Sequence, residues 1–452
     1  MTQLDKENSM EQRLATKAIP TLFLMYALPQ IGSMLFVAFQ SIVDGLIVGR
    51  LIGANALAAV NVVMPSYALI TAVALIIGIG TQAQMSIHLG EKNYSGAKSD
   101  IINGLFGLLI FNLLATVCIN IYPEELARWL GANDTIMPLA LDYIQGVMPW
   151  LVCIGTVLFL DFILKGLGKP KLAITLFSSI VVFNIALSYS LVKFTGLSTF
   201  GVGLGTGISY AIGTLAYLCA IRHTYKSMSE LANAKAQWSV RTFNRIAYNG
   251  SSEGLAEISV GISIFLYNIT LMKYVGEKGV AAFSLVDIMM YVCASIIIGV
   301  SNGIIPIVSY LCGAKLFDRI KQTCRLAVTV NFIVGIVFIA MMYLYSGSIV
   351  EIFVGTQEPL VENLAINGSR LLSLTFIFSG FNIFAASYFT AFDKPGYSLI
   401  IAAFRGLLFL CAGIILLPLF LGVNGIWLAA PIAEVLTFVA AVYFLRKNTL
   451  IH

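Results

Sequence analysis

Residues 53–92 read GANALAAVNVVMPSYALITAVALIIGIGTQAQMSIHLGEK, and residues 276–315 read GEKGVAAFSLVDIMMYVCASIIIGVSNGIIPIVSYLCGAK. The two stretches align without a gap at a separation of 223 residues, and the positions that match are mainly glycine, alanine and serine. A second match between the two halves follows, because the dipeptide Lys169-Pro170 recurs as Lys394-Pro395. A duplicated, strongly apolar chain is typical of secondary transporters, in which substrates bind between two related halves.

The composition places the chain in a membrane. Hydrophobic residues make up 59% of it and charged residues 11%, whereas soluble domains carry about 25% charged residues. A soluble fold of 452 residues could not cover its core with so little polar surface. The 7 cysteines stand singly without a CxxC pattern, which argues against a disulfide framework and against a zinc site.

Several classes of function lack their signatures in this chain. There is no HExxH, GxSxG or Walker-type phosphate loop, so neither a zinc protease, a serine hydrolase nor an ATP-driven pump is indicated. The net charge of +5 comes from scattered lysines and arginines and not from a basic stripe with interleaved aromatics. We therefore expect no enzyme, no cofactor and no nucleic-acid partner.

A membrane-spanning helix needs about 20 mainly apolar residues, and such runs recur twelve times. We expect an all-α integral membrane fold with transmembrane helices at 18–48, 56–88, 100–121, 137–164, 171–193, 201–222, 246–273, 280–311, 322–346, 363–391, 397–420 and 424–445. The most polar internal stretch, 223–245, is expected to be a cytoplasmic linker between two six-helix lobes, the N-lobe (18–222) and the C-lobe (246–445). An even number of spans in each half makes the internal repeat parallel.

The placement of lysine and arginine predicts the orientation in the membrane. With the N-terminus inside, the cytoplasmic segments hold 20 of these residues and the outer segments hold 5. We therefore expect a multi-pass protein of the plasma or inner membrane, with the N-terminus (1–17) and the C-terminus (446–452) in the cytoplasm.

Ionisable side chains inside a membrane cost at least about 2.5 kcal/mol and usually face a cavity or a partner. Among the ionisable residues of the predicted spans we single out six acids and two bases. The acids are Asp44, Asp161, Glu253, Glu257, Asp287 and Glu434, and the bases are Arg370 and Arg405. This excess predicts an electronegative interior, which favours a cationic cargo or a coupling cation.

Asp44 lies late in the first span and has two interpretations. A carboxylate in an apolar setting can bind and release a proton or Na⁺ and thereby couple ion flow to transport. Alternatively, Asp44 is an acid at the outer end of the helix that pairs with Arg50. The spacing alone favours neither interpretation.

Three acids of the second half are candidates for a cavity. Glu253 and Glu257 lie one helical turn apart on one face, so either one of them is protonated or both face water or a cation. Asp287 lies among methionines and aromatics, which suit an adaptable pocket. The structural alternatives are a helix end near Arg245 for Glu253 and ordinary packing around a hydrogen-bonded acid for Asp287.

The other two acids of the spans differ in their local partners. Asp161 stands four residues before Lys165, so a structural ion pair on one helix face is expected. Glu434 has no obvious local partner, and its role stays open.

The chain resembles the multidrug and toxic compound extrusion (MATE) family, and in particular its MepA-like branch, over nearly all its length. The order and spacing of several stretches carry the resemblance. These stretches are SIVDGLIVGRLIGANALAAVNVVMP (41–65), HLGEKNYSGAK (88–98), LKGLGKPKLAI (164–174), GTGIS (205–209), VGEKGVAAFSLVD (275–287) and SYLCGAK (309–315). The resemblance implies two six-helix lobes in a V shape that work by alternating access, and the antiport of organic cations against H⁺ or Na⁺.

The resemblance also assigns residues. Asp44 falls on the first-helix acid that the family uses for cation coupling, Asn184 on the asparagine of an N-x-x-x-D pattern, and Thr206 on the neighbouring threonine of the sixth helix. Here the pattern departs from the family, because Ser188 replaces the aspartate, and a site with fewer charges favours protons over Na⁺. A second departure is Ser252, where the family commonly has a proline.

Together these features predict a cation-coupled antiporter, using H⁺ or Na⁺, that exports amphipathic organic cations and drugs from a cell. Asp44, Asn184 and Thr206 would form the ion-coupling site, with Na⁺ at Asp44 as the one metal ion to consider. Glu253, Glu257 and Asp287 would bind the cargo. We expect a monomer whose partners are small organic cations, the coupling ion and the lipid bilayer. The alternative is a flippase or metabolite exporter of the same wider superfamily, and a membrane enzyme or scaffold is a more distant hypothesis.

Overall fold

The computed structural model describes Leu14, residues 16–354 and residues 358–448, so most of the predicted cytoplasmic N-terminus and the last four residues of the C-terminus lie outside it. Within these ranges every regular element is a helix and no strand occurs. Eleven helices are long and apolar enough to cross a membrane, and the bent pair Pro359–Ser373 and Phe376–Ala391 can supply a twelfth crossing. The predicted all-α membrane fold with twelve spans is thereby confirmed.

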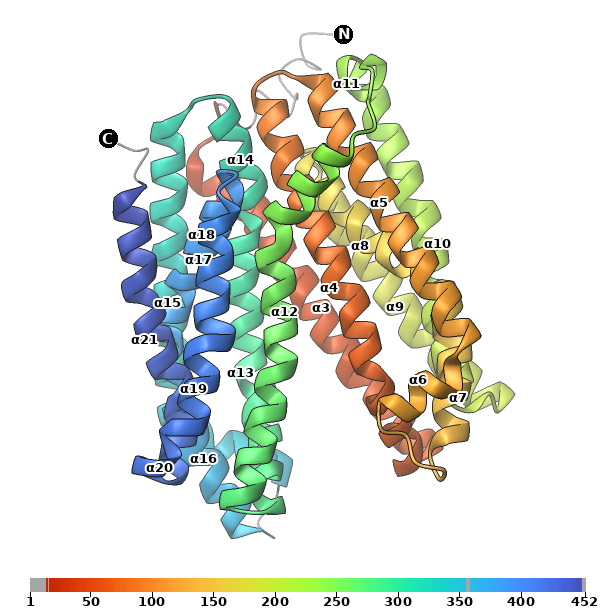
Figure 1. The fold of residues 1–452 in the computed structure, drawn as a ribbon, viewed down its shortest axis with the longest axis vertical. Helices are drawn as coiled ribbons and strands as arrows, with labels where there is room; N and C mark the ends of the chain where they lie inside the picture. The colour runs from red at the N-terminus through yellow and green to blue at the C-terminus, as the bar shows by residue number, and fades with distance from the viewer. Residues whose placement is uncertain (1–13, 15, 355–357, 449–452) are drawn as a thin grey trace. The chain divides into compact units, whose positions relative to one another are not determined.

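The helices of the described chain each overlap a predicted span or connect two of them (Figure 1). In the N-terminal half they are α3 (Ile19–Ile47), α4 (Ala54–Gly90), α5 (Tyr94–Ile121), α6 (Pro123–Trp129), α7 (Met137–Val147), α8 (Leu151–Gly166), α9 (Pro170–Thr195), α10 (Ser198–Ser227) and α11 (Ser229–Asn233). In the C-terminal half they are α12 (Val240–Tyr274), α13 (Glu277–Gly303), α14 (Ile305–Gly313), α15 (Phe317–Val354), α16 (Pro359–Ser373), α17 (Phe376–Ala391), α18 (Pro395–Ala403), α19 (Phe409–Leu416), α20 (Pro418–Leu421) and α21 (Val423–Lys447).

Several spans of the described chain are interrupted, which the apolar runs alone did not predict. A short 3₁₀ turn at Met148–Trp150 separates α7 from α8, where Pro149 lacks the N–H that a continuous helix requires. The pair α16 and α17 bends by 49°. A π-helical turn, η4 (Phe404–Leu408), joins α18 to α19. Such turns break the regular hydrogen-bond ladder and often mark functional positions.

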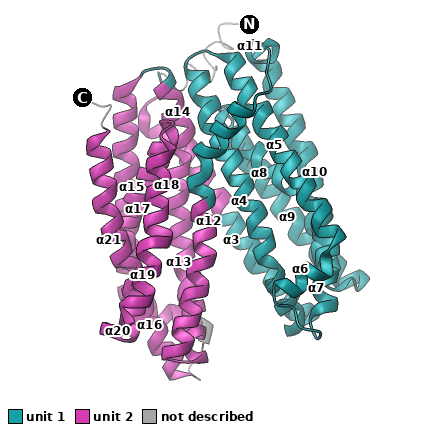
Figure 2. Ribbon diagram, in the orientation of Figure 1, with its two compact units in different colours: residues 1–16, 35–254, 313–315 teal, residues 17–34, 255–312, 316–452 magenta. Residues whose placement is uncertain are grey.

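The chain packs into two compact units, shown in separate colours in Figure 2. Unit 1 contains residues Leu35–Gly254 and the short loop Gly313–Lys315. Unit 2 contains Lys17–Met34, Leu255–Cys312 and the described chain from Leu316 onward. Both α3 and α12 therefore contribute one segment to each unit, so the units follow packing and not only the order of the spans along the chain. The predicted lobe boundaries stay a prediction.

Unit 1 is held together by a close crossing of α4 and the first part of α12. A Cβ atom added to Gly80 would lie 2.1 Å from the carbonyl oxygen of Ile246, and one added to Gly250 would lie 1.9 Å from that of Ile76. No side chain fits at either position, so glycine is required for the two backbones to approach. Small residues serve this purpose at many helix interfaces in membranes, where dispersion contacts drive association.

Unit 2 contains the counterpart of this crossing, made by α13 and the first part of α3. A Cβ atom added to Gly299 would lie 2.6 Å from the Cα of Ile31, and one added to Gly303 would lie 2.9 Å from the Cα of Ala27. Gly303 and Gly80 are 223 residues apart, as in the sequence repeat. The repeated small residues thus mark a repeated helix contact.

The polar stretch between the halves is fastened to unit 1. The Lys98 Nζ donates to the carbonyls of Ala232 and Ala234, at 2.6 and 2.9 Å. Asn103 donates to the carbonyl of Gln237 at 2.8 Å and accepts from the N–H of Ser239 at 2.8 Å. The stretch predicted as a linker therefore lies along α5, is hydrogen-bonded to it, and leads into α12.

Candidate functional site

A chain of buried amides and hydroxyls crosses unit 1 from α3 to α10. The Gln40 Nε2 donates to Asn184 Oδ1 at 2.9 Å, and Asn184 Nδ2 donates to Thr206 Oγ1 at 3.0 Å. Thr206 in turn donates to the carbonyl of Val202 at 3.1 Å. The structure thus brings together two of the predicted site residues, Asn184 and Thr206, and adds Gln40, which sequence reasoning missed.

The close packing of α9 on α10 positions this chain. A Cβ atom added to Gly205 would lie 2.4 Å from Ser188 Oγ, so glycine at this position lets the two helices approach. The Ser188 hydroxyl donates to the carbonyl of Val202 at 3.4 Å and accepts from Asn184 Nδ2 at 3.4 Å. Ser188 therefore takes part in the chain as a weak neutral partner at the place where the resemblance implied an aspartate.

Asp44 lies half buried on α3, one helical turn after Gln40, whose side chain also reaches its carboxyl group. The carboxyl Oδ1 is buried and has no hydrogen-bond partner among the described residues. No ion pair joins Asp44 to Arg50 in the described chain, so the structural interpretation of Asp44 as a paired helix-end acid is wrong. Asp44 is an acid with one buried oxygen that lacks a hydrogen-bond partner in the described chain.

Three tyrosines from three further helices surround this acid. The charge of Asp44 acts on the hydroxyls of Tyr67 of α4, Tyr143 of α7 and Tyr210 of α10. Tyr67 and Tyr210 are hydrogen-bonded to each other, and Tyr210 is within reach of Gln40. No sequence signal pointed to the tyrosines, whereas the spacing of four residues before Asp44 could have pointed to Gln40.

Two of the three predicted cargo-binding acids lie together in unit 2. Glu257 on α12 is exposed and Asp287 on α13 is half buried, and the charges of both act on the hydroxyl of Tyr291. Asp287 also acts on the hydroxyl of Tyr267, whose ring stacks on Phe283 with centroids 4.7 Å apart. Two carboxylates beside aromatic rings are suited to a cation, because ring faces and carboxylates both attract positive charge.

The third acid, Glu253, precedes Glu257 by one turn of α12 but belongs to unit 1, because the division between the units falls after Gly254. It is half buried and has polar contacts of its own. The structure thus groups Glu257 with Asp287 and places Glu253 in the unit that contains Asp44.

The two remaining acids have partners. Asp161 forms an ion pair with Lys165 one turn away, as predicted, and accepts a hydrogen bond from the hydroxyl of Tyr217 at 2.8 Å. Glu434 pairs with Arg405 at 2.9 Å. The second pair could not be read from the sequence, since the two residues lie on different helices.

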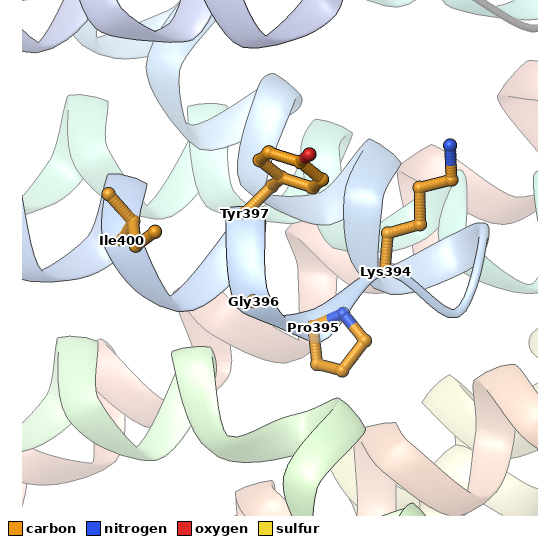
Figure 3. A pocket seen from close by; sticks show the side chains of 5 residues that line it. All are labelled: Lys394, Pro395, Gly396, Tyr397 and Ile400. Carbon is orange, nitrogen blue, oxygen red and sulfur yellow. The ribbon is translucent and has the colours of Figure 1, made fainter. Parts of the chain in front are cut away.

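A metal-binding group or a hollow would be a further candidate site in the described chain. No group of three or more histidine, cysteine, aspartate or glutamate side chains in it is arranged to hold a metal ion. A hollow of about 330 Å³ lies at the start of α18 (Figure 3). Its lining consists of Lys394, Pro395, Gly396, Tyr397 and Ile400, and none of the candidate site residues contributes to it.

Comparison with known proteins agrees with this architecture. The chain is 24% identical to the multidrug export protein MepA of Staphylococcus haemolyticus, over 94% of this chain and 93% of that protein. It is 25% identical to the FAD transporter of Shewanella oneidensis, over 96% of both chains. The solved outward-facing structure of a multidrug resistance MATE family transporter superposes with a TM-score of 0.88, at 20% identity, covering 96% of this chain and 97% of that one.

A family model settles which group of proteins these similarities define. The model of the MatE family matches residues 29–190 and 254–440, and thus covers most of both halves of the repeat. The predicted resemblance is confirmed. The chain is a multi-pass membrane protein that belongs to the MatE family.

Proposed function

We propose that this protein exports amphipathic organic cations across the membrane by alternating access, in exchange for H⁺ or Na⁺ bound at Asp44. The observation that supports this proposal best is the buried, unpaired Oδ1 of Asp44 beside the chain of Gln40, Asn184 and Thr206. A buried acceptor without a partner costs about 1–3 kcal/mol, and a bound proton or small cation would remove that cost.

The polar chain gives the coupling step a physical basis. With Asp44 ionised, the N–H donors of the chain stabilise its negative charge. Binding of a cation removes this charge, and the hydrogen bonds along Gln40, Asn184 and Thr206 can then rearrange. A ligand shifts a conformational equilibrium only when it interacts differently with the two states, and a charge that is removed in a low-dielectric interior provides such a difference. Ser188 in place of an aspartate favours H⁺ over Na⁺, because fewer carboxylates remain to hold a metal ion.

Unit 2 would supply the cargo site. The charges of Glu257 and Asp287 both act on the hydroxyl of Tyr291, and Met289 and Met290 follow Asp287 in the sequence. Carboxylates attract the cationic group, while methionine and aromatic side chains adapt to different apolar bodies. Glu253, which belongs to unit 1, stays a candidate cargo-binding acid on the basis of the sequence. The names of the MepA relatives, which are multidrug export proteins, support the same class of cargo.

The proposal includes the setting of the protein. We place it in the plasma or inner membrane as a monomer with both termini in the cytoplasm, following the distribution of lysine and arginine. It requires no cofactor and performs no covalent chemistry on its cargo.

Transport in proteoliposomes tests the proposal directly. Ethidium export driven by an imposed pH gradient is compared with export driven by an imposed Na⁺ gradient. Asp44→Asn should reduce gradient-driven export at least 10-fold while the protein stays folded. Asp134→Asn is the matched control, since the Asp134 side chain is 92% exposed in the same unit and its surface ion pair with Arg128 contributes little. Full export by Asp44→Asn at normal protein levels would overturn the assignment.

A second candidate function is the export of an anionic metabolite. The FAD transporter among the relatives supports it, and Arg370 is the basic residue of the predicted spans that has no carboxylate partner in the described chain, its Nε donating to Ser346 Oγ at 3.1 Å. An anionic cargo would need such a cation. Competition of FAD with ethidium export, and its loss in Arg370→Gln, would favour this candidate over the first.

A further inference from the structure

The predicted linker, residues 223–245, carries an excess of positive charge on exposed side chains. Its charged residues are one acid and four bases, namely Glu230, Lys226, Lys235, Arg241 and Arg245, and all five are exposed. None of them belongs to the proposed coupling or cargo sites, so this charge is available to another partner.

Hydrogen bonds to its main chain fix the course of the linker along α5, between α11 and α12 (Figure 1). The Ser95 hydroxyl donates to the carbonyl of Lys235 at 2.6 Å, and the N–H of Gln237 donates to Ser99 Oγ at 3.0 Å. The bonds of Asn103 continue this contact further along α5. Because α5 binds the main chain of the linker, the Lys235 side chain is left exposed.

One face of α5 is apolar and exposed. Four side chains that recur every three or four residues form it, and they are between 41% and 57% exposed: Ile102, Phe106, Ile110 and Leu113. Residues at this spacing share one face of a helix. On a membrane-spanning helix such a face is covered by lipid, because no other part of unit 1 covers it.

Trp238 of the linker lies on this apolar face. Its ring packs edge-on against Phe106, with centroids 4.9 Å apart, and it remains 49% exposed. Phe243 packs beside the same helix at Gly107, where an added Cβ atom would lie 2.0 Å from the Phe243 ring. The two aromatic contacts hold the linker against the lipid-covered face. An indole, with an apolar body and a polar N–H, favours the boundary between hydrocarbon and headgroups.

Basic residues flank this tryptophan three positions away on either side. Lys235 and Arg241 are exposed, and neither forms an ion pair in the described chain. The acid of α5 that lies along this stretch, Asp100, is buried and bonded to His88 at 2.7 Å, so it does not neutralise them. Near an anionic membrane surface each lysine or arginine strengthens binding by about 5-fold.

We infer that the linker around Trp238 is a binding surface for an anionic phospholipid in the leaflet that it faces. Trp238 and Phe106 contact the upper part of the acyl chains, and Lys235 and Arg241 pair with the phosphate. The distribution of lysine and arginine predicts that this leaflet is the cytoplasmic one, whose anionic lipids attract basic segments next to spans. The surface lies on unit 1 alone and is independent of the coupling ion and the cargo.

Brominated lipids test this surface, because bromine on an acyl chain quenches a nearby tryptophan. The full-length chain in phosphatidylcholine nanodiscs is titrated with brominated phosphatidylglycerol or with brominated phosphatidylcholine. The chain has 4 tryptophans, so the signal of Trp238 is the difference between each protein and its Trp238→Phe version. The wild type should reach half-maximal quenching at a mole fraction about 5-fold lower for the anionic lipid.

The variant Lys235→Gln/Arg241→Gln should lose this preference, so that the two brominated lipids quench at equal mole fractions. The matched control is Lys193→Gln/Lys273→Gln, which removes two exposed lysines from the last turns of α9 and α12 and leaves the linker intact. Equal mole fractions for the two lipids in the wild type would overturn the inference, as would a preference that persists in the linker variant.

The wild type alone decides if the linker variant does not fold. Salt raised from about 0.1 M to about 1 M shortens the screening length from about 10 Å to about 3 Å. The preference for the anionic lipid should then disappear, while quenching by phosphatidylcholine remains. A preference that salt leaves unchanged would contradict the pairing with phosphate. Absence of quenching by either lipid would show that Trp238 does not lie at the bilayer.

Discussion

Two buried ion pairs, Asp161–Lys165 in unit 1 and Glu434–Arg405 in unit 2, are similar in chemistry but differ in surroundings. Asp161 and Lys165 lie one turn apart on α8, with side chains 7% and 4% exposed, and Tyr217 donates to the second carboxylate oxygen. Glu434 and Arg405 come from separate elements, the arginine is partly exposed, and Asn382 offers a free acceptor. The first pair is enclosed within one helix, whereas the second joins two elements and has a base that reaches water.

This difference indicates how much each pair depends on its base. Desolvation makes a lone charge in a low-dielectric interior expensive, so loss of the base from a fully buried pair is costly. Where the base is partly exposed, water can replace part of its interaction with the acid. Asp44 is a third case, because no basic side chain pairs with it in the described chain and its buried Oδ1 has no hydrogen-bond partner there.

The largest expected effect is that of Lys165→Met. Removal of the lysine leaves Asp161 in a buried site where, among the described residues, Tyr217 is the one donor that remains, and we expect a loss of about 4 kcal/mol of stability. Thermal unfolding in detergent measures it. The double variant Asp161→Asn/Lys165→Met should recover most of this lost stability, because it removes both charges. If Lys165→Met were as stable as the wild type, Asp161 would not depend on the lysine.

Gly250→Val changes only the packing of two helices, so its loss of stability is a reference for the losses caused by the ion-pair variants. The new Cβ would meet a backbone oxygen of α4, so the helices must separate, at a cost of about 3 kcal/mol. Gly261→Val on the same helix is the control, because a Cβ atom there meets nothing within 4 Å. Equal thermal stability of the two variants would contradict the close crossing in unit 1.

Asn184→Ala tests the chain that leads to Asp44. Gln40 and Thr206 would each lose a buried partner, and we expect a loss of about 2 kcal/mol together with weaker gradient-driven export. Asn120→Ala is the control, because the Asn120 side chain bonds only to an exposed turn of its own helix. If both variants kept wild-type export, the amide chain would have no role in coupling.

Arg405→Met should have the smallest effect, about 1 kcal/mol, and it sharpens the comparison with Lys165→Met. The Arg405 side chain is partly exposed, so water can replace part of the pair, and Asn382 still donates to the Glu434 carboxylate. The two variants are compared in the same unfolding assay. A loss as large as that of Lys165→Met would mean that the pair in unit 2 is as closed as the pair in unit 1.

Much of the fold could be predicted because its determinants are local or repeated. Apolar runs of sufficient length fix the spans, and the 223-residue repeat of small residues marks the two close crossings. The breaks at Pro149 and in η4 were not predicted, since hydropathy does not register how a helix is interrupted. The bounds of the polar linker stay a prediction, and its attachment to α5 depends on side chains of a distant helix.

The candidate sites likewise combine features that the sequence determined with features that only the packing of helices determined. The sequence alone determined which acids lie within the membrane and that Asp161 has Lys165 one turn away, because the helical period fixes neighbours at four residues. Only the tertiary structure decided that Asp44 is left without a base, that Gln40 joins it to Asn184, and that Glu434 meets Arg405 and Asn382. These partners lie on different helices, and their meeting depends on how helix faces pack, which no spacing along the chain encodes.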